Sequence, residues 1–287
     1  MVPTFIIGLR EGLEAALIVG IIAAFLIQRG RRSELRWMWV GVAAASGLCI
    51  GIAAITRVVG RELPERQREG MTAVISLVAV FAITYMIIWM RRHSRGMKRS
   101  LERSAEGALA GGTVFAIVGM AFFAVLREGL ETAVFLLAAF QASSNPTATA
   151  VGAVLGIGVA IGLGYAIYVG GIRINLARFF RFTGFVLVLV AAGLLATAVE
   201  AGTNAGAIGF LTEPALNLRW FVAEGTLPGA LMTGLFGVQA EPSWAQVLAW
   251  LCYAVPMVAF VLWPHRPAGP ERSATVSPGL SEPARSV

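Results

Sequence analysis

The sequence contains no aspartate, two histidines and two cysteines, and this scarcity excludes several kinds of site. Cys49 and Cys252 lie singly in apolar runs, so they define neither a disulfide framework nor a metal motif, and we expect them to pack in the core. His93 and His265 lie in a charged loop and in the tail. A zinc or copper site of the usual His/Cys type inside the apolar stretches is therefore not expected. The only lysine, Lys98, lacks the spacing of a phosphate-binding loop, which argues against an ATPase.

Charge is also scarce, at 14% of the 287 residues, whereas 57% are hydrophobic and the mean hydropathy is +0.76. This composition predicts a polytopic membrane protein with all-α spans. The net charge of +7 comes from arginines in short loops between apolar runs. That pattern is typical of membrane orientation, so we expect no nucleic-acid partner. The N-terminus lacks a basic region and a cleavage site, which favours a retained span over a signal peptide.

Seven apolar stretches are long enough to cross a bilayer core of about 30 Å as helices. They lie at 3–28, 37–56, 71–90, 113–141, 148–171, 183–200 and 246–263. The fourth is ambiguous, because its apolar run extends back to Ala108 and Gly111-Gly112 marks a break or a re-entrant start at 108–121. The loops hold sixteen Arg and Lys on one side and five on the other. This bias predicts an N-terminus outside and a cytoplasmic C-terminus.

The chain therefore divides into a seven-helix transmembrane domain, 1–263, and a tail, 264–287. The tail is rich in Pro, Ser and charge, and we expect it to be disordered in the cytoplasm. The long loop at about 201–245 is moderately apolar, with Trp220 and Phe221. We expect it to lie on the outer interface or to dip into it.

One pentapeptide, Arg-Glu-Gly-Leu-Glu, occurs twice, at Arg10–Glu14 and at Arg127–Glu131, each time inside an apolar stretch. An ionised side chain near the bilayer centre costs roughly 2.5–3.5 kcal/mol on insertion scales, so six of them need a reason. Three spans separate the copies, so the two helices run antiparallel. We predict an inverted repeat with halves at about 3–92 and 107–200, plus an extra helix at 246–263. Such repeats place a substrate site near the midplane.

On a helical wheel the three ionisable residues of the first copy share one arc, with Glu14 between Arg10 and Glu11. Gly12 points away, on a ridge of small residues suited to close helix packing. That ridge consists of Gly8, Gly12, Ala16 and Gly20, with a shorter counterpart at Gly129 and Ala133. Two facing copies bring together two guanidiniums and four carboxylates, a net charge of −2 when all are ionised. The carboxylates are Glu11, Glu14, Glu128 and Glu131. Oxygen ligands suit hard cations.

Other readings stay open at this point. The motifs can be buried ion pairs that only fix helix register. Glycines at 152, 156, 158, 162 and 164 have helix-packing spacing rather than that of a dinucleotide fingerprint. Met86 and Met90 are either soft ligands on an inner path or packing residues. Glu200 either lines an entrance or is a helix-end charge.

The doubled motif, together with the segment Phe122–Gln141, the run Met86-x-x-Trp89-Met90 and the run Gly170–Leu176, resembles the oxidase-dependent iron transporter family. That family includes the fungal high-affinity iron permeases and the bacterial EfeU-type permeases. The resemblance implies iron import across the cytoplasmic membrane, with the four motif glutamates as iron ligands and Arg10 and Arg127 as their partners. The fungal members carry an external acidic motif that contains Asp, so this chain looks like the bacterial branch.

The same resemblance implies an extracytoplasmic iron-binding protein and a peroxidase or oxidase as partners, with iron as transported substrate and no permanently bound cofactor. A permease for another cation, such as Pb(II) or Mn(II), is the close alternative. An intramembrane glutamate-dependent enzyme is disfavoured because no histidine lies in the spans. A structural or partner-anchoring protein is the third class.

Overall fold

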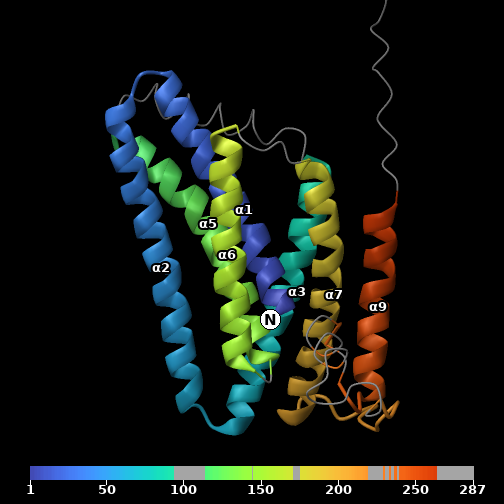
Figure 1. Ribbon diagram of the computed structural model, residues 1–287. Helices are drawn as coiled ribbons and strands as arrows, with labels where there is room; N and C mark the ends of the chain where they lie inside the picture. Colours follow the sequence, from blue (N-terminus) through green and yellow to red (C-terminus); the bar gives the residue numbers. More distant parts are fainter. Residues whose placement is uncertain are drawn as a thin grey trace, which may run out of the picture.

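A computed structural model describes residues 1–93, 114–143, 145–170, 175–218 and 239–263, together with residues 229, 233, 236 and 237. Seven long helices make up nearly all of these described ranges (Figure 1). They are α1 (Val2–Gln28), α2 (Leu35–Glu62), α3 (Glu65–His93), α5 (Val114–Gln141), α6 (Pro146–Tyr168), α7 (Leu176–Asn204) and α9 (Trp244–Leu262). A short 3-10 turn, Arg32–Glu34, precedes α2.

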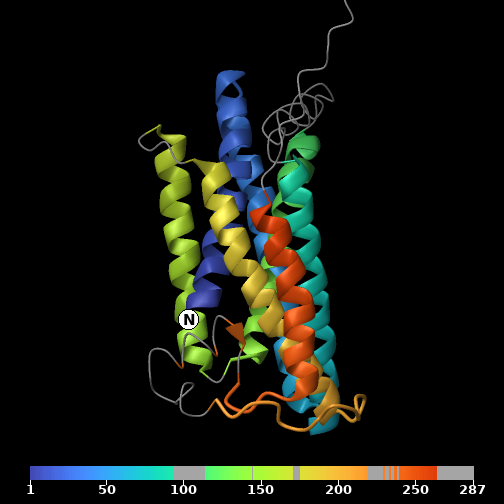
Figure 2. The same cartoon turned by 90° about the vertical axis from the view of Figure 1, so that its right-hand side faces the viewer.

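Successive helices run in opposite directions along one bundle (Figures 1 and 2). Six of the seven are long and apolar enough to cross a membrane. The exception is α5, in which every 18-residue stretch includes Arg127, Glu128 and Glu131. Large apolar side chains such as Phe81 and Phe115 face outward, as they do where lipid is the solvent. The protein is therefore a multi-pass, all-helical membrane protein.

Side-chain caps explain several of the helix starts. Asn145 accepts a hydrogen bond from the Ala148 amide before α6, and Asn175 accepts one from Arg178 before α7. Ser243 forms a reciprocal capping box with Gln246 before α9. The predicted spans are shorter than the helices at 35–62, 65–93 and 176–204, because hydropathy marks the membrane core whereas helices continue into the polar turns.

The ambiguity at the fourth span is settled in part. Residues from Val114 onward belong to α5, so 114–121 is continuous with that helix. Residues 108–113 lie outside the described residues, as do the tail 264–287 and the aromatic pair Trp220 and Phe221.

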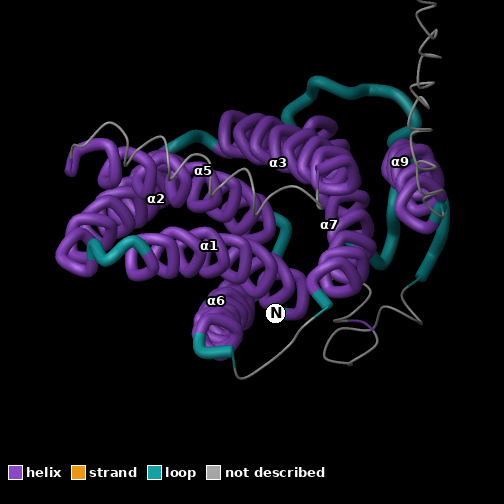
Figure 3. Tube along the Cα trace, turned by 90° about the horizontal axis from the view of Figure 1, so that it is seen from above, coloured by secondary structure: helices purple, strands orange, loops and turns teal. Residues whose placement is uncertain are grey.

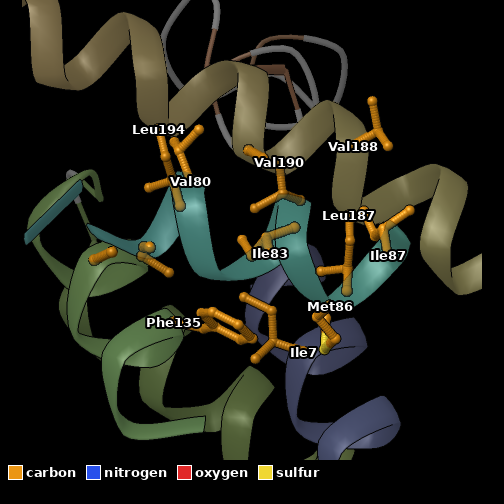
Figure 4. Packing of buried hydrophobic residues seen from close by; sticks show 14 of the residues in the cluster. Ile7, Val80, Ile83, Met86, Ile87, Phe135, Leu187, Val188, Val190 and Leu194 are labelled. Carbon is orange, nitrogen blue, oxygen red and sulfur yellow. The ribbon is translucent and has the colours of Figure 1, made fainter. Parts of the chain in front are cut away.

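The helices pack in pairs (Figure 3). α1 packs mainly on α6, α5 on α2, and α3 on α7, while α1 and α5 also pack on each other. α9 packs on α7 at the edge of the bundle. Two buried apolar clusters result. The larger joins residues of α1, α3, α5 and α7 (Figure 4), and the smaller joins α1, α2 and α5.

The loop after α7 returns to the bundle before α9 begins. The backbone amide of Ala215 donates to the carbonyl of Pro242. Gly237 lies so close to Gly193 of α7 that an added Cβ on Gly193 would be 2.9 Å from the Gly237 Cα. Because Gly193 lies eleven residues before the end of α7, the described part of this loop dips well below the helix ends.

Candidate metal-ion site

The first motif copy is placed by close packing of α1 on α6. A Cβ added to Gly12 would lie 2.8 Å from the Cβ of Ala160, and one added to Gly152 would lie 2.2 Å from the Met1 carbonyl oxygen. Gly8 meets the backbone of Ala153 in the same way. The predicted small-residue ridge is therefore used, and it turns the charged arc away from α6.

The second copy is placed by a matching contact of α5 on α2. A Cβ added to Gly129 would lie 2.7 Å from Cys49 Sγ, and one added to Gly41 would lie 2.5 Å from the Val118 carbonyl oxygen. Cys49 thus packs in a helix interface, as expected, whereas the same expectation is wrong for Cys252, which is exposed on α9. Not every glycine pair does so. The expectation that Gly158 and Gly162 mediate packing is wrong, because an added Cβ at either position meets nothing within 4 Å.

The side chains of the first copy are almost entirely buried. Arg10 is 1% exposed, Glu11 1% and Glu14 7%. Arg10 Nε lies 3.3 Å from Glu14 Oε1, and Arg10 Nη1 lies 3.5 Å from Glu11 Oε1. The predicted i,i+4 pair is confirmed, and the same guanidinium also reaches the second carboxylate.

The second copy has the same pairing with more exposure. Arg127 Nε donates to Glu131 Oε1 at 3.2 Å and lies 4.0 Å from Glu128 Oε1. The Arg127 side chain is 49% exposed and that of Glu131 22%, whereas Glu128 is buried. One face of the second copy is therefore open where the first is closed.

Carboxylates from the two copies converge. Glu11, Glu128 and Glu131 can each present one oxygen so that these atoms all lie within 4.8 Å of one another. Oxygen ligands stand about 2.0–2.6 Å from Mg²⁺ or Ca²⁺, so oxygens on opposite sides of one such ion are roughly 4–5 Å apart. Glu14 is not part of this group and is held by Arg10. The sequence predicted that all four glutamates meet and that Glu14 and Glu131 have equivalent positions. In the structure Glu131 joins the cluster, whereas Glu14 pairs with Arg10 beside it.

Several of these oxygens are buried without a partner. Among the described residues, Glu11 Oε2 and Glu128 Oε2 accept no hydrogen bond, and Glu14 Oε1 has only its ion pair with Arg10. A buried polar atom without a partner is costly, and in a native structure it calls for an explanation such as an absent ion. The donor set is oxygen only and carries more negative than positive charge. It therefore suits a hard or borderline cation of charge two or three.

Both arginines also contact α3. Arg10 Nη1 lies 3.1 Å from Met86 Sδ, and Nη2 donates to Met90 Sδ. The guanidinium carbon of Arg127 lies 4.8 Å from the centre of the Trp89 ring. Sequence reasoning missed these contacts. The spacing of Met86, Trp89 and Met90 was the available signal, because it places the three side chains on one face of α3 within a single turn.

A cavity of about 420 Å³ lies at the end of the bundle where α2 ends and α3 begins, which we call the α2–α3 end. Its polar lining comes from four helices and includes Thr56, Arg68, Glu69, Thr72, Gln141, Thr197 and Glu200. Gln239 of the returning loop donates a hydrogen bond to Glu200. Glu200 thus lines a cavity, which favours the entrance reading over a simple helix-end charge.

An apolar layer separates this cavity from the glutamates. Leu137 lines the cavity and lies six residues after Glu131, about 9 Å along α5 at 1.5 Å per residue. Between them, Phe135 packs in the same cluster as Ile7 of α1, and neither side chain is exposed (Figure 4). On the other side of the glutamates lies the smaller cluster, which contains Ile18 and Ile117. Along the bundle axis the carboxylates thus lie between two apolar layers, while Glu131 and Arg127 keep one exposed side.

Comparisons with known proteins decide the family. The Iron permease FTR1 family matches residues 1–267. The chain belongs to the iron permease family. Among its relatives is the ferrous iron permease EfeU of Escherichia coli O6:H1, 42% identical over 276 residues, which cover 95% of this chain and 100% of the relative. The ferrous iron permease EfeU of Yersinia pestis is 40% identical over 272 residues, covering 94% and 96%. No solved structure matches the chain.

Membership confirms the resemblance inferred from the doubled motif, including its bacterial character, because both relatives are bacterial. It also identifies the protein as an iron permease, since the family and the relatives are named as permeases.

Proposed function

We propose that the protein imports iron across the cytoplasmic membrane, with the ion crossing at the cluster formed by the two motif copies. The observation that carries this proposal is the convergence of Glu11, Glu128 and Glu131 from two antiparallel helices. Glu14 acts from the edge of the cluster through Arg10. Fe(II) is the species we favour, because the relatives are named ferrous iron permeases.

The charge balance supports transient binding. With four carboxylates and two guanidiniums ionised, the cluster carries −2, which a divalent ion neutralises. The pairs Arg10–Glu14 and Arg127–Glu131 keep the cluster from binding too tightly, because each arginine already offsets one carboxylate. A transport site needs this moderation, since the ion has to leave again.

We propose seven spans arranged as an inverted repeat plus α9, with the N-terminus outside. Exchanging α1, α2 and α3 for α5, α6 and α7 leaves the pattern of packed helix pairs unchanged. The interfaces α1–α6 and α5–α2 also share their spacing. In the α1–α6 interface, Met1, whose carbonyl meets Gly152, lies eleven residues before Gly12, and Gly152 lies eight residues before Ala160, which packs on Gly12. In the α5–α2 interface, Val118, whose carbonyl meets Gly41, lies eleven residues before Gly129, and Gly41 lies eight residues before Cys49, which packs on Gly129. We count α5 as a span because Glu128 is buried in the bundle and Arg127 is paired with Glu131.

The route of the ion follows from the cavity. We propose that the cavity at the α2–α3 end is the outer vestibule, in which the carboxylates of Glu69 and Glu200 outnumber the one guanidinium, Arg68, and so attract cations. The layer formed by Ile7 and Phe135 then separates vestibule and site, and the layer around Ile18 closes the inner side. The structure thus fits an occluded state, and alternating movement of the two layers would expose the site to each side in turn.

Partners and energy source are proposals from the family resemblance. We propose an extracytoplasmic iron-binding protein and a peroxidase or oxidase that deliver iron to the vestibule. The membrane potential supplies about 2.3 kcal/mol per charge for each 100 mV, so roughly twice that for a divalent ion.

Uptake of radiolabelled iron into proteoliposomes tests the proposal. Changing Glu11, Glu14, Glu128 or Glu131 to Gln in turn should reduce transport strongly in both motif copies, while Glu213→Gln, an exposed loop glutamate, should leave it unchanged. Each variant has to elute from gel filtration like the wild type. Near-normal uptake by all four variants would refute the site. Competition by Mn(II) and Pb(II) in the same assay tests the alternative that another cation is the substrate.

A further inference from the structure

One turn of α3 contacts the arginines of both motif copies. Met86 and Met90 accept hydrogen bonds from the two terminal nitrogens of Arg10, and the ring of Trp89 lies 4.8 Å from the guanidinium carbon of Arg127. Positions i, i+3 and i+4 share one face of a helix, so these three side chains point the same way. This turn of α3 thus contacts both guanidiniums.

The turn is firmly anchored. Met86 is 3% exposed and Met90 6%, and both belong to the large apolar cluster that joins α3 to α7. Met86 lies beside Ile7 of α1, next to the layer that separates vestibule and site (Figure 4). A displacement of Arg10 toward α3 would therefore have to displace this packing.

The chemistry of these partners is unusual for buried arginines. A thioether is a weak, uncharged acceptor, and an aromatic face attracts a cation without accepting a proton. Neither adds negative charge, so neither competes with the carboxylates for the transported cation. Both nevertheless offer the guanidinium a favourable contact away from the glutamates. Leucine at these positions would leave the N–H groups of Arg10 facing hydrocarbon, at a desolvation cost.

We propose that Met86, Trp89 and Met90 are positioning residues that hold Arg10 and Arg127 at the flank of the glutamate cluster and so leave carboxylate oxygens free for the transported cation. The proposal rests on the proposed function, because it sets the affinity of that same site. Without these partners the guanidiniums turn further onto the carboxylates. The cation then binds more weakly, while the folded transporter keeps its turnover.

The test measures Fe²⁺ uptake and anoxic equilibrium binding of Fe²⁺ to the purified full-length protein. Met86→Leu/Met90→Leu and Trp89→Leu should each raise the KM for Fe²⁺ and the Kd about threefold to tenfold, as expected for weak contacts of this kind, with maximal uptake per folded transporter little changed. The matched controls are Met257→Leu, a partly buried methionine of α9 at the edge of the bundle, and Trp39→Leu, an exposed tryptophan. Both should behave like the wild type.

A double-mutant cycle with Arg10→Lys separates positioning from packing. If the methionines act through Arg10, the change in Kd caused by Met86→Leu/Met90→Leu shrinks in the Arg10→Lys background; if they only pack, the two effects add. Additive effects, or an unchanged KM in the double leucine variant, overturn the proposal. The single variants Met86→Leu and Met90→Leu decide the question if the double variant does not fold. A wild-type protein that binds no Fe²⁺ refutes the proposed function itself, which distinguishes the two failures.

Discussion

The same five residues sit in two different environments. In α1 the copy is sealed, with Arg10 1% exposed and bound to two carboxylates and two thioethers. In α5 the copy is half open, with Arg127 49% exposed and stacked over Trp89. The pentapeptide therefore fixes which groups can pair, whereas the surrounding helices determine how deeply each ion pair is buried and so how strong it is. A buried pair is costly to break, and an exposed one contributes little.

The largest expected difference between the copies concerns their arginines. Arg10→Gln should destabilise the protein by about 3–5 kcal/mol, because it leaves buried carboxylates without their counter-charge. Arg127→Gln should cost roughly 0–1 kcal/mol, because that side chain is half exposed. Thermal unfolding in detergent compares the two variants. Equal destabilisation of the two variants would show that the difference in side-chain exposure does not change the contribution of each arginine to the free energy of unfolding.

A second comparison asks whether the two copies depend on their backing helices alike. Gly156→Ala on α6 would place a Cβ 2.2 Å from the Phe5 carbonyl oxygen, and Gly41→Ala on α2 would place one 2.5 Å from the Val118 carbonyl oxygen. Each should cost about 1–3 kcal/mol, since backbone has to move. Gly158→Ala is the matched control on α6, because nothing lies within 4 Å of its added Cβ.

Gly158→Ala should be neutral or slightly stabilising, because alanine is the better helix former. The measurement is again thermal unfolding, together with iron uptake. Loss of stability in Gly156→Ala but not in Gly41→Ala would mean that only the sealed copy needs close backbone contact.

The smallest expected effect lies outside both copies, in the vestibule. Glu200→Gln should raise the KM for iron by about two- to threefold without lowering maximal uptake, because a single charge there changes the local ion concentration and not the site. Kinetics of uptake at varied Fe²⁺ measure it. A fall in maximal uptake with an unchanged KM would place Glu200 in the translocation step instead.

Much of this arrangement follows from the sequence. The doubled motif, its antiparallel placement by span parity and the Arg10–Glu14 pair all depend on local periodicity and on counting, which a sequence contains. The contacts of Met86 and Trp89 with the arginines depend on how α3 is rotated against α1 and α5, which local patterns do not specify. Helix rotation also decides that Glu131 but not Glu14 joins the carboxylate cluster. It decides in the same way that Gly158 and Gly162 face no neighbouring helix.

The central claim is that the two motif copies build one cation site. The most direct measurement is the number of Fe²⁺ ions bound per purified chain, determined by anoxic equilibrium dialysis for the wild type, Glu11→Gln from the first copy and Glu128→Gln from the second. The account predicts one bound ion per wild-type chain at saturating Fe²⁺ and its loss in each variant, with Glu213→Gln unchanged. Two ions per chain, with either glutamine variant still retaining one, would contradict it, because each copy would then bind an ion by itself.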